Sequence, residues 1–88
     1  MIVEFKESFK KDLEKILDKK ILVNVNSVIE QVEDSHSLDQ LNKLKKLKGY
    51  KTFYRIRIGD YRIGLTIERS TVSFVRILHR KDIYKFFP

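Results

Sequence analysis

The chain has 88 residues, 42% of them hydrophobic and 35% charged, with a formal net charge of +7 and no cysteine. These values allow one domain with a small core, residues 1–88, and exclude a disordered chain, a disulfide scaffold and a thiolate zinc site. No apolar run approaches the roughly 18 residues of a membrane helix, and the N-terminal MIVEFKESF lacks the features of a signal peptide, so a cytoplasmic protein without a membrane partner is expected.

The first half of the chain is expected to form one strand and two helices. The β-prone stretch Met1–Phe5 predicts a strand. Apolar residues at helical spacing then predict an amphipathic helix of about three turns that buries Phe9, Leu13, Ile16 and Leu17. A second set at the same spacing predicts another helix and comprises Ile21, Leu22, Val25, Val28, Ile29 and Val32. Because almost no linker separates the two, they are expected to form a helical hairpin.

A lysine-rich connector follows the hairpin. Ser37 and Gln40 have the spacing of a capping box, which predicts that a short helical turn begins there. The next leucines recur at intervals of three, which a 3₁₀-like segment would place on one side: Leu38, Leu41, Leu44 and Leu47. Four lysines project around them, Lys43, Lys45, Lys46 and Lys48, and Gly49 ends the segment.

From Tyr50 onward the pattern predicts an antiparallel meander. Alternating stretches at Phe53–Ile58, Tyr61–Glu68 and Thr71–His79 are separated by turns at residues 59–60 and 69–70. Residues 80–87 are expected to form a short helix or an irregular cap. The predicted fold class is α+β, with an N-terminal strand and a two-helix hairpin that packs on one face of the meander.

Alternation along the predicted strands places arginines on the sheet face that points away from the helices. This face is predicted to carry Arg55, Arg57, Arg62, Arg76 and Arg80. Strict alternation along the third strand also assigns Val72 and Phe74 to the arginine side. It assigns His79 to the opposite side, under the helices.

The net positive charge of the chain lies in its second half. Residues 43–88 contain 13 Lys and Arg against 3 Asp and Glu, whereas residues 1–42 contain 6 against 9. A half this basic suggests a polyanionic partner, most simply nucleic acid, with a charged surface that only aids solubility as the alternative. Since the planar guanidinium fork matches phosphate oxygens in pairs, five arginines on one face favour a phosphate-binding surface.

Three stretches, in this order, resemble the RelE/ParE superfamily of bacterial and archaeal toxins from toxin–antitoxin pairs. They are residues 47–49 (LKG), 54–63 (YRIRIGDYRI) and 79–84 (HRKDIY). The resemblance covers nearly the whole chain and implies a RelE-like fold and a cognate antitoxin as partner. For the RelE-like branch it implies cleavage of mRNA on the ribosome, by attack of the ribose 2′-OH on the adjacent phosphate. Other members of the superfamily poison DNA gyrase, and a degenerate member would act only as the partner of its antitoxin.

Carried over position by position, the resemblance implies roles for single residues. Arg62 matches the phosphate-stabilising arginine, Arg80 a second arginine suggested for the leaving group, and Tyr84 the tyrosine that stacks on or orients the substrate nucleotide. Arg55 and Arg57 match two positions that are lysines in the best-studied enzymes. RNA and phosphate contacts are further expected from Lys43, Lys45, Lys46, Lys48, Lys51, Arg76 and Lys81, although the lysines at 43–48 also fit a solvated patch or one that faces ribosomal RNA.

The identity of the general base stays open. Arginine essentially cannot lose its proton, so Arg55 and Arg57 are interpreted as groups that orient and stabilise phosphate. Lys51, Tyr84 and His79 are the remaining candidates, and histidine as a residue type titrates near neutral pH. The predicted side of His79 favours a packing role unless the strand breaks near residues 78–80. Catalysis by positioning and electrostatics alone is the other option. No acidic or histidine cluster has metal-ligand spacing, so neither a metal nor another cofactor is expected.

Overall fold

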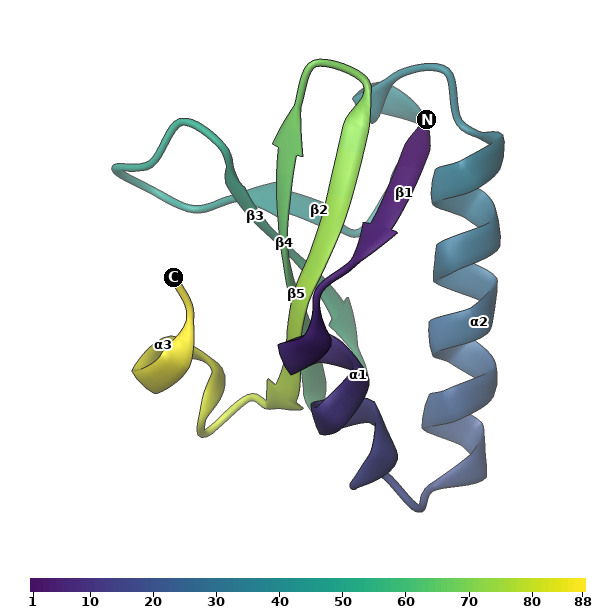
Figure 1. Ribbon diagram of the computed structural model, residues 1–88, viewed down its shortest axis with the longest axis vertical. Helices are drawn as coiled ribbons and strands as arrows, with labels where there is room; N and C mark the ends of the chain where they lie inside the picture. The colour runs from purple at the N-terminus through teal and green to yellow at the C-terminus, as the bar shows by residue number, and fades with distance from the viewer.

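The computed structural model describes all 88 residues and contains a twisted five-stranded sheet with helices on both sides (Figure 1). In chain order the elements are β1 (Ile2–Phe5), α1 (Glu7–Glu14), α2 (Lys19–Asp34), a 3₁₀ turn η1 (Leu38–Gln40), β2 (Leu44–Lys46), β3 (Phe53–Ile58), β4 (Tyr61–Glu68), β5 (Thr71–His79) and α3 (Ile83–Phe86). The strand order is β1-β5-β4-β3-β2, with β1 parallel to β5 and the other neighbours antiparallel. No helix is long and apolar enough to cross a membrane. The predicted α+β class is confirmed.

The core lies between the sheet and the two N-terminal helices. Its largest fully buried side chains include Phe9 of α1, Val25 of α2, and Leu65 and Phe74 of the sheet. The rings of Phe9 and Phe74 meet edge to face with their centroids 5.4 Å apart, the arrangement that aromatic quadrupoles favour. The predicted apolar stripe of the second helix is thus the surface that α2 presents to the sheet.

The first helix is one turn shorter than the hydrophobic spacing predicts. It ends at Glu14, and Leu17, predicted to be buried, is 88% exposed in the turn before α2. The side chain of Asp18 accepts hydrogen bonds from the backbone N–H groups of Lys20 (2.9 Å) and Ile21 (3.4 Å). This N-cap begins the second helix. It therefore leaves too little chain for the first helix to continue through Leu17.

The connector differs from its prediction in two ways. In the predicted capping box, the Ser37 side chain makes no capping hydrogen bond, and the Gln40 side chain instead accepts from the backbone N–H of His36 (2.7 Å). The helical turn stops at Gln40, and Leu44–Lys46 forms the edge strand β2 instead of continuing a 3₁₀-like segment. Hydrogen bonding to the free edge of β3 overrides the spacing of the leucines.

Two residues of β5 lie on the face opposite to the predicted one because the strand contains a bulge. The register of β4 and β5 shifts between Gly64 and Leu65, so Val75 has no partner on β4. An extra residue of this kind reverses the alternation on either side of it. Val72 and Phe74 consequently point into the core and not toward the arginine side.

The C-terminal segment covers part of the sheet face opposite to the core. The predicted tail contains the short helix α3, after which Phe87 packs edge to face on Phe53 with ring centroids 5.5 Å apart and is only 3% exposed. Gly64 lies beneath this ring, and a Cβ atom at that position would lie 2.6 Å from ring atoms of Phe87. The absence of a side chain at Gly64 lets the C-terminal segment lie flat on β4.

Replacing Gly64 by alanine should destabilise the protein by about 1–3 kcal/mol, because the new methyl group overpacks the Phe87 ring. Urea unfolding of the single variants Gly64→Ala and Phe87→Ala and of the double variant measures the effect. In the Phe87→Ala background the alanine at position 64 should be nearly neutral. An equal cost in both backgrounds would show that the ring is not what requires glycine there.

Candidate nucleic-acid interface

Strands β3 and β4 bring three arginines together on the sheet face away from α1 and α2. Arg57 lies directly opposite Arg62, and Arg55 lies opposite Gly64. None of the three arginines forms an ion pair. Like charges that face each other across two strands are destabilising, so this surface favours an anionic ligand. Together with Arg80 these residues are called the arginine face.

The guanidinium of Arg62 is held in place by the turn between β3 and β4. Its Nη1 donates to the carbonyl oxygens of Gly59 (2.8 Å) and Tyr61 (3.0 Å). Burial lowers the pKa of Arg62, and the positive charges of Arg57, Arg55 and Arg80 lower it further, while the ionised form of Tyr84 would raise it. Arg62 remains a cation at any physiological pH. The downward shift in the pKa of Arg62 thus reflects its burial first and the neighbouring positive charges second.

The same turn also holds Arg80. The backbone N–H of Arg80 donates to the carbonyl oxygen of Asp60 (2.7 Å), and its Nε lies 3.9 Å from Asp60 Oδ1. Gly59 has a φ of 54°, a left-handed conformation that glycine adopts without strain. Two adjacent turn residues thus position both arginines to which the RelE/ParE resemblance assigns chemistry. Sequence reasoning missed this role of Asp60, although the residue stands inside the YRIRIGDYRI stretch.

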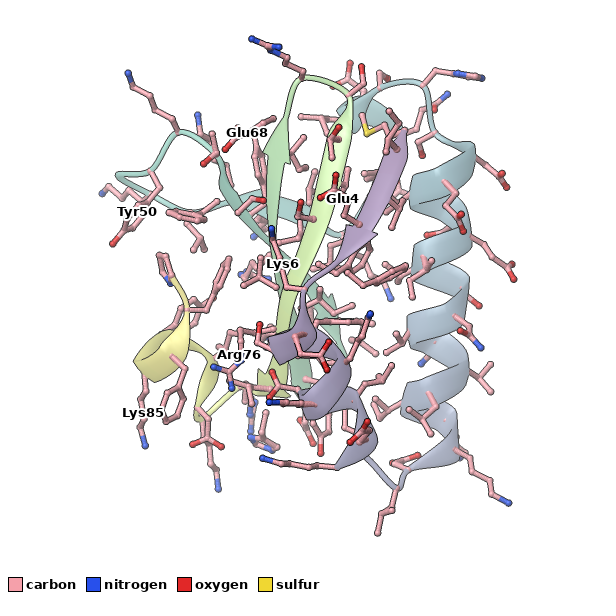
Figure 2. The ribbon with its side chains drawn as sticks, viewed as in Figure 1. Glu4, Lys6, Tyr50, Glu68, Arg76 and Lys85 are labelled. Carbon is pink, nitrogen blue, oxygen red and sulfur yellow. The ribbon has the colours of Figure 1, made fainter.

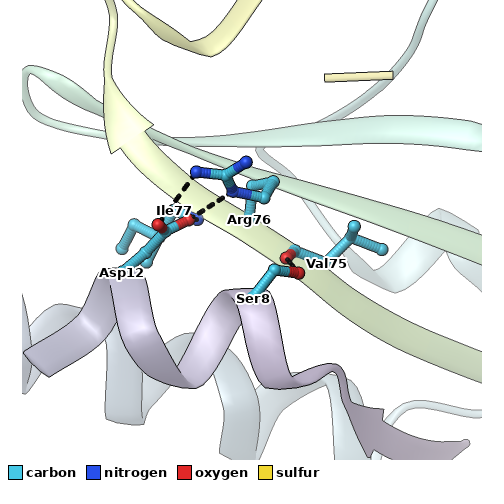
Figure 3. A network of polar contacts seen from close by, with 5 residues as sticks. All are labelled: Ser8, Asp12, Val75, Arg76 and Ile77. Atoms are coloured by element: carbon cyan, nitrogen blue, oxygen red, sulfur yellow. Dashed lines mark hydrogen bonds and ion pairs between the residues drawn. The ribbon is translucent and has the colours of Figure 1, made fainter. Parts of the chain in front are cut away.

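Arg76 is engaged elsewhere, so the predicted cluster of five arginines contains four. Its Nε and Nη2 donate to the two carboxylate oxygens of Asp12 on α1 at 2.6 and 3.0 Å (Figure 3). This hydrogen bonding raises the pKa of Arg76. Its guanidinium also lies 5.6 Å from the ring centroid of Phe86, so that Arg76 sits between α1 and α3 (Figure 2). Because Asp12 already neutralises it, Arg76 stabilises the fold and is a poor candidate for phosphate binding.

His79 does not join the arginine face. It lies opposite Tyr61 on the helix side of the sheet, and the two rings meet edge to face with centroids 5.7 Å apart. Its Nδ1 accepts a hydrogen bond from the backbone N–H of Lys81 (3.2 Å). Strand β5 continues to His79 without a break. His79 therefore has a packing environment, and the structure does not bring it to the arginines as a base.

The remaining predicted residues surround the arginine face unevenly. Lys45 lies opposite Arg55 and shares its side of the sheet, whereas Lys46 lies opposite Tyr54 on the other side. Lys48 and Lys51 are exposed in the loop between β2 and β3, and Lys81 is exposed after β5. Tyr84, 58% exposed on α3, lies close enough to Arg62 to influence its pKa. Lys43 and Lys45 join Arg55 and Arg57 around a shallow depression.

Comparison with known proteins assigns the family. Residues 3–84 match the family described as ParE toxin of type II toxin-antitoxin system, parDE. The chain belongs to this toxin family. The toxin is 45% identical to Toxin RelE3 of Methanocaldococcus jannaschii over 89 residues, which span both chains completely. The predicted RelE/ParE superfamily is therefore confirmed, and the protein is the toxin component of a type II toxin–antitoxin system.

Solved structures agree with this assignment. The RelB-RelE antitoxin-toxin complex from Methanococcus jannaschii matches with a TM-score of 0.83 and 41% identity, covering 97% of this chain and 99% of that one. The toxin-antitoxin complex RelBE2 from Mycobacterium tuberculosis matches with a TM-score of 0.65 and 28% identity, covering 90% and 96%. The predicted RelE-like fold is thus confirmed.

Proposed function

We propose that this toxin is an endoribonuclease that cuts mRNA on the ribosome without a metal ion, and hence acts in the cytoplasm. The observation that supports the proposal best is the arginine face, where Arg57 opposes Arg62 and Arg80 is anchored beside them. The only ion-pair partner of these cations is the exposed Asp60. The names of the two relatives above 40% identity, RelE3 and RelB-RelE, agree with a ribonuclease more than with a gyrase poison.

The arrangement suits phosphoryl transfer to a neighbouring hydroxyl. The ribose 2′-hydroxyl loses its proton to a general base and its oxygen forms a bond to phosphorus. The bond from phosphorus to the 5′-oxygen breaks and that oxygen takes up a proton from solvent, leaving a 2′,3′-cyclic phosphate and a 5′-hydroxyl. Arg62 stabilises the negative charge that develops on the phosphate oxygens, and Arg80 stabilises the leaving oxygen. Arg55 and Arg57 hold the phosphate in line, and Tyr84 stacks on the base next to it.

Because His79 lies on the other side of the sheet, Lys51 and Tyr84 remain as candidates for the general base. Whichever serves, positioning and electrostatics supply most of the rate enhancement.

A gyrase-poisoning activity is the second candidate. It is favoured by the family description itself, which names ParE. In that case the arginine face would contact a protein or DNA surface and would not act on a scissile phosphate. Tyr84 would then be dispensable, because no nucleotide would need to be stacked.

A cognate antitoxin is the proposed protein partner under either activity. The family consists of toxins from two-protein systems, and the solved relatives include complexes with antitoxins. A net charge of +7, concentrated in residues 43–88, favours an acidic antitoxin segment over this half of the chain.

Two assays on the purified toxin separate the candidates. In a translating extract, primer extension should reveal cuts in the message that recur in phase with codons. In a supercoiling assay, DNA gyrase should remain active at the same toxin concentration. An intact message together with inhibited gyrase would overturn the ribonuclease proposal in favour of the second candidate. An intact message with active gyrase would indicate a degenerate toxin.

Asp60→Asn should tighten RNA binding but slow cleavage. Removing the carboxylate removes a negative charge beside the arginine face, so binding of RNA should strengthen about 2- to 5-fold. The same change releases Arg80 Nε from its partner 3.9 Å away, so the cleavage rate of bound RNA should fall about 3- to 10-fold. Asparagine keeps the turn, and the pair is too exposed for its loss to change stability measurably. Single-turnover kinetics separate the two effects, and a parallel loss of binding and rate would contradict a positioning role.

A further inference from the structure

The depression beside β2 is lined only by cationic side chains and one glycine. Lys43, Lys45, Arg55, Arg57 and Gly59 enclose a volume of about 380 Å³ without any apolar residue. None of the four cations forms an ion pair. The depression exists because Leu44–Lys46 is a strand, which places Leu44 opposite Ile56 of the core and Lys45 opposite Arg55. Lys45 and Arg55, which line the depression together, thus come from neighbouring strands and are 10 residues apart in sequence.

The depression continues the arginine face across the sheet. Arg80 directly follows β5, Arg62 is the second residue of β4, Arg57 lies opposite Arg62 on β3, and Lys45 lies on β2. Adjacent strands are about 4.8 Å apart, so cations occur on three neighbouring strands and directly after a fourth, in a row that crosses the sheet obliquely. The depression occupies the end of this row that is farthest from Arg80. A polyanion bound at Arg62 and Arg80 would reach it by continuing along the row.

We propose that this depression is a second phosphate subsite, which holds the phosphodiester next to the scissile one in single-stranded RNA. The inference rests on the proposed ribonuclease function and extends it by a binding position. Lys43 and Lys45 supply mobile point charges for this neighbouring phosphate, while Arg55 and Arg57, which hold the scissile phosphate, form the boundary that the two subsites share. No hydrophobic or aromatic residue lines the depression, which argues against a base-binding pocket, because nucleobases stack on aromatic or apolar side chains.

The salt dependence of RNA binding tests the subsite. The probe is a short single-stranded RNA that carries a 2′-O-methyl group at the cleavage position, with affinity measured by fluorescence anisotropy at several salt concentrations. Each phosphate contact to a single strand contributes about 0.7 to the slope of log K against log salt. The slope is negative, and the double variant Lys43→Gln/Lys45→Gln should make it shallower by about 0.7 because one phosphate contact is lost. Lys19→Gln/Lys20→Gln removes the same charge from the exposed start of α2 and should leave the slope unchanged.

A neutral linkage in the RNA locates the contact. A methylphosphonate placed one position to either side of the protected linkage removes the charge of a single neighbouring phosphate. For the wild-type toxin, one of these two substitutions should weaken binding about 5- to 10-fold. The lysine double variant should be insensitive to that same substitution, because the contact is already lost.

Each alternative outcome has a defined meaning. Equal slopes for the wild-type toxin and the lysine variant would overturn the subsite, and the ribonuclease proposal would stand as long as the toxin cuts mRNA in the extract. The subsite would also be overturned if the lysine double variant bound the short RNA normally but bound empty ribosomes more weakly than the wild-type toxin. The depression would then face ribosomal RNA. A toxin that neither binds the short RNA nor cuts mRNA would refute the ribonuclease proposal itself.

Discussion

Arg62→Ala should reduce the rate of mRNA cleavage by about 10²- to 10³-fold, the usual cost of removing a preorganised donor from a developing oxyanion. The guanidinium is already held by the carbonyl oxygens of Gly59 and Tyr61, so no reorganisation is needed when the phosphate arrives. RNA binding should fall far less, because Arg55, Arg57 and Arg80 remain. Single-turnover primer extension gives the rate, and anisotropy with the uncleavable RNA gives the affinity.

The fold should tolerate this substitution. Arg62 is one of several like charges on one surface, and both its burial and the repulsion from Arg57 and Arg55 lower its pKa. Its removal should leave the unfolding temperature unchanged or slightly raised. Arg69→Asn is the matched control, since it removes one arginine from the opposite end of β4, at a left-handed position with a φ of 57° that asparagine accepts. Comparable losses of cleavage in both variants would mean that net charge, and not the position of Arg62, is what matters.

Hydrophobic periodicity in the sequence predicted those elements in which the pattern of apolar and polar side chains by itself indicates the buried face. The second helix and strands β3 and β4 have long and regular patterns, and these elements occur where the patterns place them. Strand β2 escaped prediction because it has only three residues, two of them lysines. It is a strand because Leu44 has Ile56 as a neighbour on β3, and such a partner is invisible to local spacing.

The candidate site was predictable in its residue types but not in its ion pairs. Alternation correctly placed Arg55, Arg57 and Arg62 together, because each belongs to an unbroken strand. Arg76 could not be excluded in this way, since its partner Asp12 lies 64 residues away. A signal was present, however. Asp12 follows Phe9 at a helical interval of three and so places a carboxylate on an apolar face, where a buried charge requires a partner.

Asp12 is needed because β5 extends beyond the end of β1. Past Phe74 the outer edge of β5 has no neighbouring strand, and α1 lies along it (Figure 3). The Ser8 hydroxyl donates to the carbonyl oxygen of Val75 (2.6 Å), and Asp12 Oδ2 accepts from the backbone N–H of Ile77 (3.1 Å). Side chains one helical turn apart thus satisfy backbone groups that a strand would otherwise pair.

Asp12→Ala should therefore lower the free energy of unfolding by about 3–4 kcal/mol. The substitution leaves Arg76 unpaired and the N–H of Ile77 without an acceptor, at a position where Asp12 is only 5% exposed. Asp12→Asn keeps an oxygen for Ile77 but loses the charge, so it should cost about 1–2 kcal/mol less than alanine. Urea unfolding measures both variants.

A surface ion pair provides the matched comparison. Asp82 Oδ1 lies 3.7 Å from Lys85 Nζ with both side chains exposed, and Asp82→Asn should cost less than about 0.5 kcal/mol. If Asp12→Asn lowers the free energy of unfolding no more than Asp82→Asn does, the contact between Asp12 and Arg76 contributes little to stability. Arg76 would then be available to the arginine face after all, and Arg76→Gln should weaken RNA binding. If Asp12 and Arg76 form the ion pair described above, Arg76→Gln should instead destabilise the fold. The salt slope of RNA binding should then stay unchanged, because a guanidinium already neutralised by Asp12 releases no counterions.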